Sequence, residues 1–191
     1  MIVNGYKIEP GADLSGANFR CADLKNVQLS GAKLIGADLS GANLNGADLT
    51  GADMTRAKLT YAGYESVGLN DVRMNRTLLW KAVLTKAILI DADLSHAHLS
   101  EANMSDADLT RANLSSAHMT YVNLTGAILK NADLTEADLY CADLTNADLT
   151  NAILIRADLS EAEKDADFTT AVLTDATWGD EEDEDDDEDL D

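Results

Sequence analysis

The chain has 191 residues, of which 46% are hydrophobic and one is proline, so it is long enough and apolar enough to fold as a single domain. Its net charge of −21 argues against direct binding to nucleic-acid phosphates. The first 14 residues lack the charged-then-apolar pattern of a signal peptide, and no apolar run approaches the roughly 20 residues of a membrane span. We therefore expect a cytoplasmic protein without a membrane partner.

Residues 1–11 are expected to form an N-terminal cap. The segment "VNGYKI", Val3 to Ile8, places an Asn-Gly turn between apolar residues, which predicts a small hairpin over the start of the domain. Such a cap would protect the first backbone edge from pairing with other chains.

Residues 12–162 contain an uninterrupted repeat of five residues. From Leu14 to Leu159 a large apolar residue, usually leucine, occupies every fifth position, and alanine usually lies two residues before it. A period of five fits neither an α-helix nor a flat strand. In a short extended segment, residues two apart share a face, so alanine and leucine point inward while the Asp or Asn between them points outward. The remaining two residues turn a corner, and the chain winds into a β-helical solenoid.

The number of sides in each coil follows from which residues stack. A spacing of twenty, or four sides, places Lys58 away from Arg73, whereas a spacing of fifteen, or three sides, stacks these two like charges. The spacing of twenty also gives a column of alternating sign: Asp13, Lys33, Asp53, Arg73 and Asp93. We therefore predict four sides, with His98 stacked beside His118.

The motif A(D/N)LXX, as in "GADLS GANLN GADLT", resembles the pentapeptide-repeat family over residues 12 to about 178. The resemblance implies an all-β fold, a right-handed quadrilateral β-helix, here of about eight coils with capped ends. It also implies a repeat body without enzymatic activity, and a physiological role that is often unknown. Some members of the family mimic DNA and bind type II topoisomerases such as DNA gyrase.

The repeat is least regular between Tyr61 and Ile90. Tyr64 is too long for the narrow core, so we expect the coil to swell or kink there. Apolar residues take outward positions in the same stretch, and exposed apolar clusters with tryptophan are typical of interaction sites. The alternative is that these residues pack on one another in drifted repeats. The candidate partner-binding residues, called the apolar band below, are Leu78, Trp80, Val83, Ile88 and Ile90.

No catalytic, cofactor or metal site is predicted. A solenoid filled by leucine and alanine has no concave pocket in which an acid, base or nucleophile could be tuned. His98 and His118 give two imidazoles on a convex surface, without a third and fourth ligand. Cys21 and Cys141 lie six coils apart, too far for a disulfide, so both are expected to be free thiols.

Residues 163–179 are interpreted as frame-shifted repeats that form a C-terminal cap. One residue is lost near Glu163, Ser160 and Glu163 match a helix-capping box, and Trp178 is placed to cover the last coil. Residues 180–191 carry eleven acids and no base and are expected to be a disordered tail, either for solubility or for a basic partner.

Two functions remain open at this point. The preferred one is a non-enzymatic rod whose surface, at the apolar band, binds an unknown protein partner. The alternative is a DNA mimic of the quinolone-resistance type that binds a topoisomerase. It rests on the segment Asp91 to Glu163, where thirteen acids and three bases give a net charge of −10, close to the charge density of DNA. The candidate acids are Asp108, Asp138 and Asp148.

Overall fold

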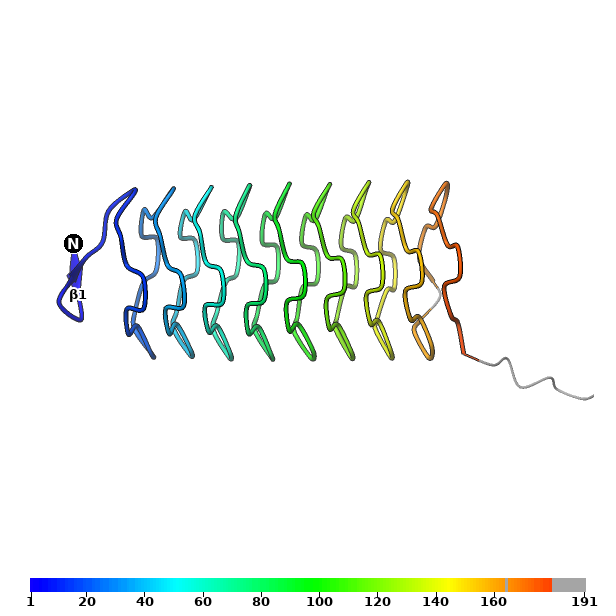
Figure 1. Cartoon of the computed structure of the whole chain (residues 1–191), viewed down its shortest axis with the longest axis horizontal. Coiled ribbons are helices and arrows are strands. Elements are labelled where there is room, and N and C mark those ends of the chain that lie inside the picture. Colours follow the sequence, from blue (N-terminus) through cyan, green and yellow to red (C-terminus); the bar gives the residue numbers. More distant parts are fainter. Residues whose placement is uncertain (164, 180–191) are drawn as a thin grey trace, which may run out of the picture.

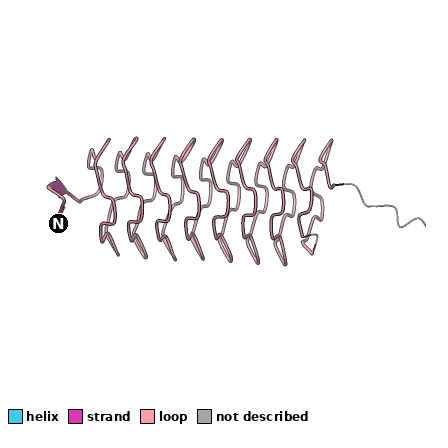
Figure 2. Cartoon of the chain, turned by 90° about the horizontal axis from the view of Figure 1, so that it is seen from below, coloured by secondary structure: helices cyan, strands magenta, loops and turns pink. Residues whose placement is uncertain are grey.

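The computed structural model describes residues 1–163 and 165–179, and Figure 1 shows them as a straight rod of stacked coils. A hairpin of two short strands, β1 (Ile2–Val3) and β2 (Tyr6–Lys7), lies at the N-terminal end. The coils that follow carry one isolated β-bridge on each side, so most of the rod is drawn as turns and loops in Figure 2. The described residues contain no helix, and hence none that is long and apolar enough to cross a membrane.

The coil has four sides, as the charge columns predicted. Parallel bridges join residues twenty apart, from Asp13 with Lys33 onward to Asp138 with Asp158. We number the sides by the outward residues of the first coil: Asp13 on the first side, then Asn18, Asp23 and Gln28. Residues on one side stack in a column along the rod, and Lys33 lies between Asp13 and Asp53.

Backbone hydrogen bonds explain why a five-residue period suits this coil. The N–H of Leu34 donates to the carbonyl of Asp53 in the next coil at 2.7 Å, and the N–H of Asp53 donates to Ala32 at 2.9 Å. At the corner, the N–H of Ala37 donates to Leu34 at 3.0 Å across Gly36, whose φ is +64°. A positive φ at the third residue of such a turn favours glycine. Each side and each corner therefore satisfies its own backbone groups.

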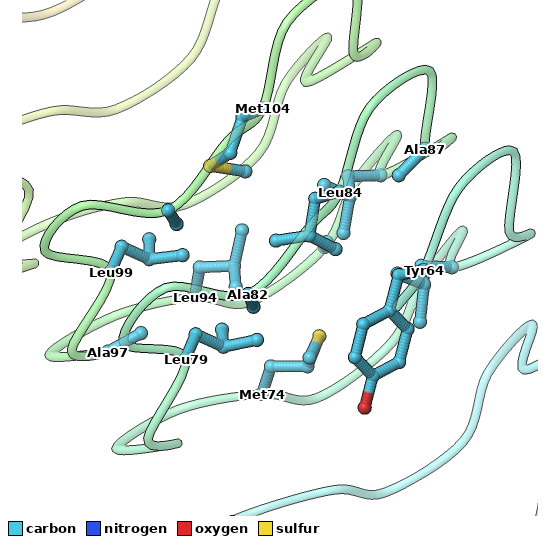
Figure 3. Close-up of a cluster of buried hydrophobic side chains, with 14 of the residues drawn as sticks. Tyr64, Met74, Leu79, Ala82, Leu84, Ala87, Leu94, Ala97, Leu99 and Met104 are labelled. Carbon is cyan, nitrogen blue, oxygen red and sulfur yellow. The ribbon is translucent and has the colours of Figure 1, made fainter. Parts of the chain in front are cut away.

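The core is a single column of buried alanine and leucine that runs the length of the coil. Regular leucines such as Leu39 and Leu109 are 0% exposed. Figure 3 shows part of the interior, where side chains from different sides of successive coils point toward one another. The interior is filled by apolar side chains from all four sides.

Tyr64 also points into this core and is 0% exposed. The coil was expected to swell or kink here, but its ladder is regular: Gly63 bridges Asn43 in the preceding coil and Val83 in the next at the usual spacing. Ten residues before and after Tyr64, on the opposite wall of the coil, the core residues are Met54 and Met74. Unbranched methionine adapts to irregular space more easily than leucine. The hydroxyl of Tyr64 has no hydrogen-bond partner among the described residues, and burial raises its pKa well above the ordinary value.

The N-terminal hairpin has the predicted turn, with positive φ values of +50° at Asn4 and +85° at Gly5. Both strands are antiparallel, with Ile2 opposite Lys7 and Val3 opposite Tyr6. The ring of Tyr6 meets that of Phe19 edge to face, with centroids 5.2 Å apart. The hairpin thus lies over the first coil.

The C-terminal end differs from expectation in one respect. The helix that the capping-box match at Ser160 and Glu163 suggested is absent: the chain stays in the coil, and the N–H of Glu163 donates to the carbonyl of Ala142 at 3.0 Å. The lost residue instead shortens the bridge spacing to nineteen, from Asp148 with Asp167 onward. Trp178 is half-buried, and its ring packs on Phe168 with centroids 5.3 Å apart. The predicted acidic tail lies outside the described residues.

Candidate functional site

The apolar band is exposed, but it does not gather into one patch. Leu78, Val83 and Ile88 replace the outward Asp or Asn of three successive sides, so they point away from the second, third and fourth sides of the rod. Their exposed fractions are 39%, 43% and 43%. Ile90 is half-buried at the corner after the fourth side. Leu78, Trp80 and Val83 follow one another around the corner between the second and third sides, and Ile90 lies at the diagonally opposite corner.

Trp80 is the centre of a small cluster at this corner. Its ring meets that of Tyr61 edge to face at 5.1 Å, and its Nε1–H donates to Glu101 at 3.1 Å. The Lys81 ammonium lies 4.4 Å from the centroid of the indole and 3.2 Å from the Glu101 carboxylate. The hydrogen bond from Trp80, followed by that from Lys81, lowers the pKa of Glu101. We call Tyr61, Trp80, Lys81 and Glu101 the Trp80 cluster.

Sequence reasoning found Trp80 but missed Tyr61 and Glu101 as its partners. The signal was present, because residues nineteen to twenty-one apart meet at one corner of a four-sided coil. Beside Tyr61 the same corner has a shallow notch of about 500 Å³. Its lining residues are Arg20, Cys21, Ser40, Gly41, Thr60 and Tyr61. This notch is open to solvent, and the one thiol that lines it, Cys21, is itself exposed.

The three candidate acids lie on two opposite sides. Asp108 and Asp148 belong to the column of the fourth side, and Asp138 to that of the second. Each accepts a hydrogen bond from the backbone N–H two residues later; the distances are 3.0 Å for Thr110, 3.1 Å for Thr150 and 3.2 Å for Tyr140. The outward acid of the repeat therefore also stabilises the corner that follows it.

Ion pairs neutralise part of the acidic half. Arg111 binds Asp91 through two hydrogen bonds, Lys130 lies 3.0 Å from Asp148, and Arg156 pairs with Glu136. The hydrogen bond from the Thr150 hydroxyl, together with Lys130, lowers the pKa of Asp148. The remaining acids are distributed over all four sides of the rod.

The histidines stack as predicted. The rings of His98 and His118 lie 4.8 Å apart and only 24° from parallel. Burial, followed by the neighbouring His118, lowers the pKa of His98. Within residues 1–163 and 165–179, no three His, Cys, Asp or Glu side chains are placed to hold a metal ion. Both cysteines are free thiols, as expected from their separation.

Comparison of the sequence with models of known protein families identifies the family of this chain. The family model for pentapeptide repeats matches eight copies, in ranges that together cover most of the chain. These ranges are 10–34, 22–60, 69–106, 92–131, 107–140 and 127–163. The chain belongs to the pentapeptide-repeat family. A comparison with curated proteins finds no significant match.

Solved structures similar to this one include two pentapeptide-repeat proteins. HetL, involved in heterocyst differentiation regulation in the cyanobacterium Nostoc sp. strain PCC 7120, is 35% identical, with 88% of this chain and 84% of HetL covered and a TM-score of 0.67. Trypsin-treated QnrB1, a plasmid-mediated fluoroquinolone resistance protein, is 18% identical, with 90% and 89% covered and a TM-score of 0.71. The likeness to QnrB1 shows the fold alone.

The family match leaves out residues 61–68, which lie at the start of the irregular stretch. This segment contributes Tyr61 to the Trp80 cluster and Tyr64 to the core. Both glycines of the segment, Gly63 and Gly68, occupy outward positions where the family motif has Asp or Asn. Within residues 10–163, the one gap in the family match therefore lies beside the Trp80 cluster.

Proposed function

We propose that this pentapeptide-repeat protein is a non-enzymatic rod that binds a protein partner through the corner at Leu78, Trp80 and Val83. The observation that carries the proposal is the exposure of these three side chains where the repeat needs nothing apolar. An indole held by Tyr61 and Glu101 is an ordered anchor, and ordered aromatic anchors surrounded by polar groups are typical of interaction hot spots.

The positions of Ile88 and Ile90, on the fourth side and at the corner after it, separate them from the rest of the proposed partner-binding surface. A partner that contacts one corner of a convex rod does not reach the fourth side at the same time. We therefore assign the primary contact to Leu78, Trp80 and Val83, and we expect Ile88 and Ile90 to contribute less. The cytoplasm is the proposed compartment, because two unpaired thiols are stable under reducing conditions.

The test compares matched exposed residues in affinity capture from the native cytoplasm. Leu78→Asp and Trp80→Ala should lose the captured partner, whereas Ile128→Asp should retain it. Ile128 is a suitable control because it is 39% exposed on the fourth side, as Leu78 is on the second. With the purified partner, the loss of affinity should be at least about 30-fold, the size expected for a hot-spot residue. Equal loss in the Leu78 and Ile128 variants would contradict the assignment.

The second candidate, a DNA mimic that binds a type II topoisomerase, is supported by the net charge of −10 between Asp91 and Glu163. The fluoroquinolone resistance protein QnrB1 shares the fold, but this likeness does not extend to function. Each candidate acid also accepts a hydrogen bond from the backbone N–H two residues later, so a test of its charge must preserve this bond. Replacement of Asp108, Asp138 and Asp148 by lysine would remove both the charge and the corner bond.

Replacement of the same three acids by asparagine removes the charge and keeps the acceptor oxygen. The chain already uses asparagine in this way at Asn103, Asn113 and Asn123, whose side-chain oxygens accept the same bond. If the protein is a DNA mimic, it should inhibit gyrase supercoiling, and the triple asparagine variant should inhibit it less, with steep dependence on salt. We expect no inhibition by either protein. If the protein inhibits gyrase and the asparagine variant does not, DNA mimicry would be favoured over binding of a partner at Leu78, Trp80 and Val83.

A further inference from the structure

Exposed aromatic residues of the coils lie at a single corner of the rod. In the described coils, Tyr61, Trp80, Tyr121 and Tyr140 are 59%, 38%, 58% and 38% exposed. All four lie between the second and third sides, and the other three corners carry no exposed Phe, Tyr or Trp within residues 12–163. Solvated corners of a repeat protein have no reason to collect aromatic rings in one column.

The four residues form two copies of one arrangement, three coils apart. Sixty residues separate Tyr61 from Tyr121, Trp80 from Tyr140 and Glu101 from Glu161. The Tyr121 and Tyr140 rings meet edge to face at 5.7 Å, as the rings of the Trp80 cluster do at 5.1 Å. The backbone is also the same: φ is +57° at Tyr61, Tyr121, Glu101 and Glu161. The chain therefore presents an aromatic pair and a glutamate twice in equivalent positions.

Two residues differ between the copies, and one of them is an aromatic residue, Trp80 in the first copy and Tyr140 in the second. Lys81 of the Trp80 cluster corresponds to Cys141, with φ values of +56° and +54°. In the first copy the Lys81 ammonium lies over the Trp80 ring and pairs with Glu101. Cys141 supplies no cation, and Glu161 forms no ion pair with any described residue.

Glu161 lies beside the second aromatic pair, because the N–H of Cys141, the residue after Tyr140, donates to the carbonyl of Ser160 at 3.0 Å. The pKa of Tyr140 is raised, chiefly by the Cys141 thiol and then by Tyr121, and the negative charge of Glu161 also contributes. The surroundings favour a cation further, because Asp138 and Asp158 follow one another in the adjoining column of the second side. The second copy thus keeps an aromatic pair and a glutamate, with Tyr140 in place of Trp80, and has no ammonium group of its own among the described residues.

We propose that Tyr121, Tyr140 and Glu161 bind the ammonium group of a lysine side chain that a protein partner supplies. The inference rests on the proposed role as an interaction surface and names the chemistry of the partner at a second position on it. Lys81 is the template: its Nζ contacts an aromatic face and donates to a carboxylate in one geometry. A compact ammonium with free N–H groups fits this geometry, whereas a trimethylated lysine cannot donate.

The probe is Nα-acetyl-lysine methylamide, titrated into the ¹⁵N-labelled full chain at constant ionic strength and followed by NMR. The matched norleucine compound has nearly the same stem without the charge. We expect chemical-shift changes at Tyr121, Tyr140, Cys141 and Glu161, at least about tenfold smaller slopes with norleucine, and weaker changes with the trimethyl-lysine and arginine compounds. Equal effects of lysine and norleucine, or lysine shifts spread over all acidic residues alike, would overturn the proposal.

Three variants test the site by exchanging residues between the Trp80 cluster, where Lys81 supplies the ammonium group, and the second copy, or by removing the Glu161 charge. Cys141→Lys should place an ammonium group of the chain itself at the second copy and so abolish the response to the probe there. Glu161→Gln should abolish the same response by removing the carboxylate charge, without introducing an ammonium group. Lys81→Cys should create a second response at Tyr61 and Trp80. A response that survives in both Cys141→Lys and Glu161→Gln would refute the site.

Lys164 lies outside the described residues and is tested directly. The response should be the same in the wild type and in Lys164→Ala; a response seen only in Lys164→Ala would mean that the chain's own lysine occupies the site, against the proposal. Because the probe is a small molecule, its failure is separate from failure of the partner to bind at Leu78 and Trp80. Failure of the probe to bind concerns only the site at Tyr121, Tyr140 and Glu161. Failure of the partner to bind concerns only the corner at Leu78, Trp80 and Val83.

Discussion

The stretch from Gly36 to Thr55 and the stretch from Tyr61 to Ile90 have the same backbone and different surfaces. Both carry parallel bridges at a spacing of twenty and bury their inward residues. In the first stretch each outward Asp or Asn accepts a hydrogen bond from the corner that follows. In the second, the outward residues Gly63, Gly68, Arg73, Leu78, Val83 and Ile88 have no side-chain acceptor for that bond.

The corners differ in the same direction. Glycine holds the positive φ at residues 36, 41, 46 and 51, whereas larger residues hold it in the second stretch, among them Tyr61 and Lys81. Non-glycine residues in this conformation cost about 1 kcal/mol each. The inward residues and the backbone ladder therefore suffice to set the fold, and the second stretch gives up local stability at its surface. Corners are mostly non-glycine beyond this stretch as well, from Asp91 to Asp175, so the missing outward acceptors and not the corners distinguish the second stretch.

The inward residues should give the largest effect if the ladder and core set the fold. Leu39→Ala should lower the free energy of unfolding by about 2 to 5 kcal/mol, because the fully buried side chain leaves a cavity in a core that cannot collapse. Urea denaturation measures this value. A loss below 1 kcal/mol would mean that the regular coils do not depend on leucine packing.

Tyr64 is the inward residue that distinguishes the second stretch. Tyr64→Phe should raise the free energy of unfolding by about 1 kcal/mol, because it removes a buried hydroxyl that has no hydrogen-bond partner. Tyr64→Leu serves as the control for ring size and should destabilise the protein, since it empties the space beside Met54 and Met74. A loss of stability in the phenylalanine variant would show that the hydroxyl is bonded in solution.

Outward acids of the regular stretch test the corner bond. Asp48 accepts from the N–H of Thr50 at 3.0 Å and makes no ion pair with a described residue. Asp48→Ala should cost about 1 kcal/mol, whereas Asp48→Asn should cost much less, because it keeps the acceptor. Urea denaturation of the two variants side by side gives the difference. Equal losses would assign the effect to charge and not to the hydrogen bond.

Acid should destabilise the rod in two stages. The pKa of His98 is lowered in the folded protein, so the stability it contributes at neutral pH is lost as the pH falls through and below its ordinary value of about 6.5. The pKa values of Asp143 and Asp158 are lowered mainly by hydrogen bonds from Thr145 and Ser160. Their contribution is present above the ordinary value of about 4 and is lost below it.

Thermal unfolding between pH 8 and pH 2 should therefore show a small decrease below pH 7 and a larger one below pH 4. High salt should leave the larger decrease in place, because hydrogen bonds and not distant charges cause the aspartate shifts. A decrease that disappears in high salt would assign the acid effect to general charge repulsion. In His98→Gln only the first stage should be absent.

The sequence predicted the period, the four sides, the hairpin and the inward residues, because each follows from a local rule repeated many times. The sequence was misleading at Ser160 and Glu163, which match a helix-capping box over only four residues. The segment instead stays in the coil, where the N–H of Glu163 donates to the carbonyl of Ala142. The cluster around Trp80 was missed for another reason. Contacts between Trp80, Tyr61 and Glu101 depend on which corner each residue occupies, and the outward residues were treated as one band along the sequence.

The smallest effect on stability is expected at Trp80, where the largest effect on partner binding is proposed. Trp80 is 38% exposed, and its contacts with Tyr61, Lys81 and Glu101 are themselves at the surface. Trp80→Ala should therefore change the free energy of unfolding by no more than about 0.5 kcal/mol, as most surface substitutions do. In a Trp178→Phe background, the fluorescence of Trp80 should be readily quenched by acrylamide in the folded protein. Protection from quenching, or a loss of 2 kcal/mol or more in the alanine variant, would place Trp80 in the structural core and remove the distinction between an outer surface that binds and an inner column that folds.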